Sequence, residues 1–182
     1  MKISNWMSWE GGVDLVALSN EKMEQPNVIV HVARMVNTPV GSAPSGMILL
    51  PNEDGSPKVM GFVSTNKTVG DYFAKNVFAD TPFEQAPTIV AESMDFNITA
   101  YLAKVTIKIE GFVVNLKLSN LGELKRENRQ SPALPFHDHS LEAAASTVEL
   151  TINGVATPVI VPPMGMSGGP AAVYSATGVY SR

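Results

Sequence analysis

The chain has no cysteine among its 182 residues. Disulfide frameworks, thiolate metal sites and cysteine nucleophiles are therefore excluded. Long apolar stretches are missing as well: no run reaches the roughly 18 residues of a membrane-spanning helix, so we expect no membrane span. Residues 1–9 lack the apolar run of a secretory signal, and we take the cytoplasm as the expected compartment.

Positive charge is also scarce. The 13 lysines and arginines are scattered and are outnumbered by 17 acidic residues, which gives a net charge of −4. Nucleic-acid binding needs a basic stripe or patch, so we expect no nucleic-acid partner. Hydrophobic residues reach 45% and charged residues only 16%, a composition typical of a chain that folds around a core. The length predicts a single domain over residues 1–182.

Glycine and proline are abundant, with 14 and 13 copies spread along the whole chain, and this spacing favours many short strands over long helices. We predict a mostly β fold, an antiparallel β-barrel or β-sandwich with one or two short helices. The helices are expected at residues 68–79, with Thr68 as N-cap, and at residues 140–146. The expected strands outside the hairpins described next are 13–18, 27–36, 46–50, 58–64, 88–92, 94–103 and two strands within 171–182 joined by a turn at 176–178.

Two hairpins are the most specific local prediction. Apolar and polar residues alternate on both sides of the turn at Glu110-Gly111, and folding there pairs Ile109 with Phe112, Ile107 with Val114 and Val105 with Leu116. The second hairpin has residues 148–152 leading to Asn153-Gly154 and residues 155–161 returning. Residues 122–136 between the hairpins read as a loop, and Ile3, Trp6 and Trp9 as one helical turn.

The leading functional hypothesis is a binding or assembly module whose barrel interior holds a small apolar ligand, without a cofactor. Its expected lining comes from the apolar faces of the predicted elements: Tyr72, Phe73, Phe96, Ile107, Ile109, Phe112 and Leu116. A structural subunit of a protein assembly is an alternative, and a homo-oligomer is an expected partner in either case. Asp14 is expected to face water, because alternation directs it away from Val13 and Leu15.

An enzyme is the third hypothesis, and it depends on Gly165-Met-Ser-Gly-Gly-Pro170. This segment, with the strands that follow, resembles the nucleophile loop G-D-S-G-G-P of trypsin-like serine proteases and departs from it at Met166. The resemblance implies Ser167 as nucleophile, with backbone N–H groups forming an oxyanion hole. The His, Asp, Ser order of that family is met by His31 and Asp71 as the other two catalytic residues.

A metal site is the last possibility that the sequence raises. His137 and His139 stand next to the expected short helix, and Glu142 would share one helix face with His139 at a spacing of three residues. These three residues are therefore the predicted metal ligands.

Overall fold

The computed structural model describes residues 5–132 and 134–182, and it is dominated by one sheet of twelve strands. In spatial order the main path is β5-β4-β3-β2-β1-β12-β10-β8-β7-β6, with β9 and β11 paired to β10. The strands are β1 (Trp6–Ala17), β2 (Val28–Thr38), β3 (Gly41–Pro51), β4 (Pro57–Ser64), β5 (Thr88–Val90), β6 (Ser93–Ile98), β7 (Leu102–Ile109), β8 (Phe112–Leu121), β9 (Lys125–Gln130), β10 (His137–Ile152), β11 (Val155–Ala156) and β12 (Ala172–Ser181).

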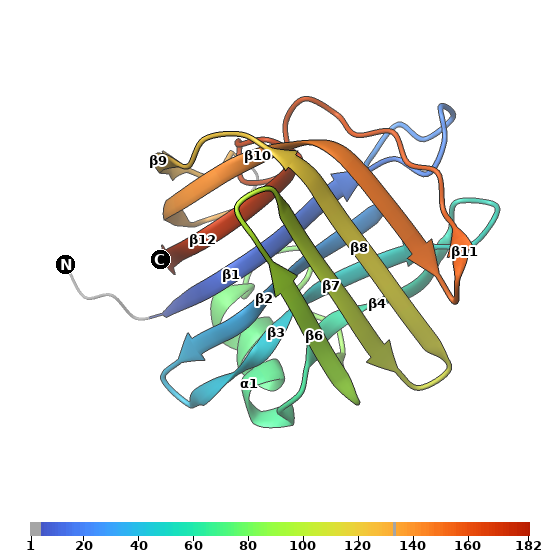
Figure 1. Cartoon of the computed structure of the whole chain (residues 1–182). Helices are drawn as coiled ribbons and strands as arrows, with labels where there is room; N and C mark the ends of the chain where they lie inside the picture. Colours follow the sequence, from blue (N-terminus) through green and yellow to red (C-terminus); the bar gives the residue numbers. More distant parts are fainter. Residues whose placement is uncertain (1–4, 133) are drawn as a thin grey trace.

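The sheet curls strongly into a half-barrel, so that β6, β7 and β8 cross over β1 to β4 (Figure 1). Every pairing is antiparallel except that of β4 with β5, which is parallel. The predicted mostly β fold is thus confirmed. In the described part of the chain, no helix combines the length and the apolar character needed to cross a membrane.

The inner core lies between the two halves of the curled sheet. Alternation sends one face of every strand into it, and fully buried members come from both halves: Val13, Leu15, Val30, Ile48, Ile107 and Leu116. These side chains stabilise the curl by removing their apolar surface from water.

A second apolar cluster covers the opposite face of β1 to β4 and β12. The helix α1 (Lys67–Tyr72) and the π-helical turn η1 (Phe73–Val77) pack there, where Phe62 of β4 contacts Phe73 and Phe78. A helical segment at this place was predicted, but its N-cap is Asn66, whose side chain accepts hydrogen bonds from Thr68 and Val69. The sheet therefore has two buried faces in this half.

The first hairpin has the predicted register, with Ile109 opposite Phe112, Ile107 opposite Val114 and Val105 opposite Leu116. The second turn is also present, but its return strand β11 has only two residues. The prolines at 158, 162 and 163 account for the early end, because proline has no N–H for the ladder.

Three predictions in the C-terminal half are wrong. Residues 140–146 are not a helix but part of β10, which pairs with β12 and β9 through its first half and with β8 through its second. This pairing on both sides outweighs the helix propensity of the Leu-Glu-Ala-Ala-Ala run. The expected loop 122–136 contains β9, and β12 runs through the expected turn at 176–178 with only a register shift.

The N-terminal tryptophans also differ from the prediction. They lie on the extended strand β1 and not on a helical turn, so Trp6 is 37% exposed and Trp9 only 6%. Ile3 lies outside the described residues.

Candidate functional site

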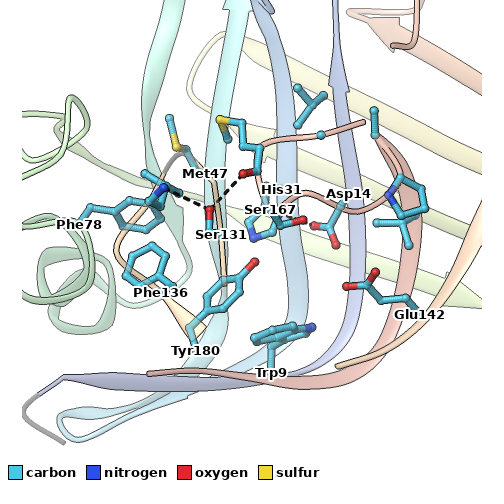
Figure 2. A pocket seen from close by; sticks show the side chains of 17 residues that line it. Trp9, Asp14, His31, Met47, Phe78, Ser131, Phe136, Glu142, Ser167 and Tyr180 are labelled. Carbon is cyan, nitrogen blue, oxygen red and sulfur yellow. Dashed lines mark hydrogen bonds and ion pairs between the residues drawn. The ribbon is translucent and has the colours of Figure 1, made fainter. Parts of the chain in front are cut away.

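A cavity lies on the outer face of the sheet, between β1, β2 and β12 and two connecting segments, one that contributes Ser131, Leu134 and Phe136 and one at residues 165–171. Figure 2 shows aromatic side chains along one side of it and carboxylates along the other. The cavity has a volume of about 50 Å³. That is room for roughly four water molecules, so the cavity suits a small molecule or a small part of a larger one.

The aromatic side is a continuous series of four rings. Tyr180 stacks on Phe136 with ring centres 5.3 Å apart and contacts Trp9 at 4.6 Å. Phe136 meets Phe78 edge-on at 5.5 Å. Trp9 is fixed by the hydrogen bond from its indole nitrogen to Ser175 Oγ, 2.9 Å long. The wall is therefore built from four distant parts of the sequence.

An irregular backbone position in β1, at Gly11, allows Trp9 and Asp14 to line the same cavity. Residues five apart on a regular strand point to opposite faces. The pairings of β1 with β12 and with β2 both skip Gly11 and resume in the same register, and the φ of Gly11, 66°, is in the left-handed region that favours glycine. Trp9 before Gly11 belongs to the outer cluster, whereas Val13 and Leu15 after it belong to the inner core, so Asp14 shares the face of Trp9.

Asp14 and His31 form the polar centre of the site. They sit opposite each other on β1 and β2, and His31 Nδ1 donates to Asp14 Oδ1 over 2.8 Å. Burial raises the pKa of Asp14 above its ordinary value, because a buried carboxylate loses hydration. Burial alone lowers the pKa of His31, but the Asp14 charge and hydrogen bond outweigh it, so this pKa is raised. The expectation that Asp14 faces water is wrong, because a second layer covers this face.

Arg129 of β9 organises the carboxylates at the far side. Its Nη2 lies 2.6 Å from Glu142 Oε2 and 3.3 Å from Asp138 Oδ2, while Nη1 lies 3.2 Å from Glu127. Asp138 is only 1% exposed, and its Oδ1 has no hydrogen-bond partner among the described residues. Burial, and then the Glu142 charge, raise the pKa of Asp138. This network therefore carries more negative than positive charge.

Arg129 also packs against the loop at residues 165–171, which carries Ser167. A Cβ on Gly169 would lie 2.5 Å from Arg129 Nη2, and Gly168 has a φ of 85°. Ser131 Oγ, from the neighbouring loop, donates to the Met166 carbonyl over 3.1 Å. Both glycines are thus required by packing and backbone conformation at these positions.

The structure brings together two of the three predicted catalytic residues. Ser167 and His31 line the same cavity, although no hydrogen bond joins them in the described part of the chain. Asp71 lies on α1, paired with Lys67 Nζ at 2.6 Å, and does not line the cavity. Asp14 occupies the position beside His31 that was assigned to Asp71. In the sequence, the signal that could have identified Asp14 is the presence of a carboxylate within the apolar strand 13–18.

The predicted ligand-binding residues divide between the two faces of the sheet. Phe96, Ile107, Ile109, Phe112 and Leu116 lie in or against the inner core. Tyr72 and Phe73 belong to the outer cluster. The cavity on the outer face was missed, because its lining residues are far apart in the sequence.

The predicted metal ligands do not share a face. His137 and His139 are exposed on β10, whereas Glu142 is buried on its other side against Arg129. The spacing argument required a helix, and this segment is a strand. Among residues 5–132 and 134–182, no group of three histidine, aspartate or glutamate side chains is placed to hold a metal ion.

Comparison with known proteins provides no family for this chain. No family model matches it, and neither a curated protein nor a solved structure matches it.

Proposed function

We propose that the protein binds a small, largely apolar molecule in the outer-face cavity, with the polar end of the molecule at the His31–Asp14 pair. The observation that carries this proposal is the combination of four contiguous aromatic rings with one hydrogen-bonded polar pair in a single cavity. Ligand sites typically combine an apolar lining with a few fixed polar groups. The Asp14 bond occupies His31 Nδ1, which leaves Nε2 for a ligand.

Trp9 offers a direct test, since it lines the cavity and the other tryptophan, Trp6, does not. A Trp6→Phe protein reports on the cavity by fluorescence when it is titrated with indole, phenol and benzyl alcohol. Native mass spectrometry of the purified protein looks for a retained molecule. A saturable change in Trp9 emission, or a retained molecule, supports the proposal.

Ala171→Leu fills the cavity, because Ala171 is buried in its wall. Ala156→Leu is the matched control, because Ala156 is exposed on β11. We expect the first variant to abolish the titration and the second to preserve it. No saturable signal with any compound, together with no retained molecule, contradicts the proposal.

A serine hydrolase is the second candidate. Asp14 bonded to Nδ1 of His31 orients the imidazole as a triad requires, with Ser167 in the wall of the same cavity. The chain order Asp, His, Ser differs from that of trypsin-like enzymes, but triads occur in several unrelated orders. Labelling by a fluorophosphonate that is lost in Ser167→Ala and kept in Ser42→Ala, at an exposed serine of β3 outside the cavity lining, supports this function, and no labelling contradicts it.

Homo-oligomer formation stays a prediction from the sequence. Static light scattering at high protein concentration tests it, and a monomer over the whole range would contradict it.

A further inference from the structure

The polar end of the cavity has an excess of negative charge. Asp14 and Glu142 line the cavity there, with Asp14 paired to His31, while Arg129 behind Glu142 also pairs with Glu127 and Asp138, so four carboxylates accompany two cationic groups. Even when His31 is protonated, the carboxylates outnumber the cations. Except for Glu127, at 34% exposed, these carboxylate side chains are at most 13% exposed, so water screens them poorly.

A second, independent observation supports the excess of negative charge. Asp138 Oδ1 is buried with no partner among the described residues, although most buried polar atoms in proteins have one. The Nη atoms of Arg129 face three carboxylates, and both oxygens of Glu142 bond Nη2, whereas its buried Nε has no hydrogen-bond partner among the described residues. One guanidinium charge thus faces three carboxylates.

The cavity wall suits a cation as well. The faces of tryptophan, tyrosine and phenylalanine attract cations through the ring quadrupole, most strongly where water is excluded. Trp9, Tyr180 and Phe136 form one side, and the carboxylates of Asp14 and Glu142 line the other. The hydrogen bond to His31 uses Asp14 Oδ1 and leaves Oδ2 for a ligand.

We infer that the molecule bound in this cavity is a small organic cation, an alkylammonium whose charged nitrogen sits between the aromatic wall and the Asp14 carboxylate. This inference rests on the proposed binding function and specifies its ligand class. An inorganic cation fits less well, because the walls are mainly apolar and supply few oxygen ligands. An anion would add to charges that are already uncompensated.

The bound cation competes with protons for the same carboxylates. Burial raises the pKa of Asp14 and of Asp138, so each of these carboxylates binds a proton more readily than an exposed carboxylate does, and a bound cation opposes that protonation. The groups facing them are His31, Arg129, Glu127, Glu142 and Tyr180. Binding of the cation releases protons, and the affinity for it rises with pH.

The test uses tetramethylammonium, which keeps its charge at every pH, with tert-butanol as neutral isostere and trimethylacetate as anion. Affinities are measured by calorimetry and by Trp9 fluorescence in the Trp6→Phe protein. We expect tetramethylammonium to bind roughly ten-fold more tightly than tert-butanol, and its affinity alone to increase with pH. In Asp14→Asn the preference is lost while tert-butanol binding is kept. The control Glu149→Gln removes a carboxylate of β10 that pairs with Lys117 away from the cavity, and it retains the preference.

If Asp14→Asn does not fold, the pH series on the otherwise unaltered protein decides. Equal or tighter binding of tert-butanol or trimethylacetate overturns the cation assignment and leaves the proposed binding function standing. The same holds if all three fail to bind while indole, phenol or benzyl alcohol binds. Failure of every compound, with no retained molecule, overturns both.

Discussion

His31 and Asp14 lie directly opposite each other on β2 and β1, with 2.8 Å between His31 Nδ1 and Asp14 Oδ1. The pair is mostly buried, beneath loops contributed by the last third of the chain. The pKa of each residue therefore depends more on the other residue than on solvent, and a substitution of one is expected to change the pKa of the other.

Asp14→Asn is expected to lower the pKa of His31. The substitution keeps an oxygen that can accept from Nδ1 but removes the negative charge that raises this pKa, so burial then dominates. NMR titration of the imidazole resonances measures the shift. The imidazole resonances of His137 and His139, which are exposed on β10, serve as internal controls. An unchanged His31 pKa would contradict the assigned electrostatic coupling.

The free energy of unfolding is expected to fall as the pH rises from about 5 to about 8. Asp14, Asp138 and His31 all have raised pKa values in the folded protein. The folded state therefore binds more protons than the unfolded state, and the stabilisation present at low pH is lost as each group deprotonates. The loss begins above the ordinary values, 3.8 for the carboxyls and 6.5 for the imidazole.

Urea unfolding at a series of pH values measures this trend. Asp54 and Asp71 do not oppose it in this window, because their pKa values are lowered and their contribution is lost only at more acid pH. Asp138→Asn should flatten the slope. Stability that rises across the window would refute the linkage.

Arg129→Met is expected to cost about 3 kcal/mol of stability, because it leaves Glu142 and Asp138 buried without a cation. Arg126→Met on the same strand is the control, since Arg126 is exposed, and its effect should stay within about 0.5 kcal/mol. Chemical denaturation of both variants provides the comparison. Adding Glu142→Leu to Arg129→Met should recover part of the loss, and equal costs for the two single variants would contradict the network.

Gly178→Ala is expected to cost about 1–3 kcal/mol and to change Trp9 emission. A Cβ there would lie 2.1 Å from Trp9 Cζ2, so the indole must move and weaken its bond to Ser175. Gly122→Ala is the matched control, because its nearest atom, the Ala144 carbonyl oxygen, is 3.6 Å away. Thermal unfolding and fluorescence measure both effects, and an unshifted indole spectrum in Gly178→Ala would count against this packing.

The parts of the fold that the sequence predicts are those set by neighbouring residues. Alternation and the turn at Glu110-Gly111 define the pairing of Ile107 with Val114 without any distant information. Residues 140–146 differ because their conformation depends on β9 and β12, which only the assembled sheet brings alongside. Local helix propensity is the weaker influence there.

The sequence indicates which residues belong to the site, but not which of them contact one another. His31 and Ser167 stand out in the sequence, and both line the cavity. Asp14 was set aside because alternation gives the face of a side chain and not what covers that face. The cover includes Phe78, Phe136 and Met166. Phe78 follows Asp14 by more than sixty positions, Phe136 by more than one hundred and Met166 by more than one hundred and fifty.

The opposite orientations of Val13 and Asp14 have a consequence for how the sheet assembles. A slip of β1 by one residue would exchange its faces, placing the Asp14 carboxylate in the inner core and Val13 and Leu15 outside it. An unpaired charge in that interior costs several kcal/mol, so the misaligned sheet is strongly disfavoured. Asp14, which lines the cavity, thus also favours the native register of β1 over registers shifted by one residue.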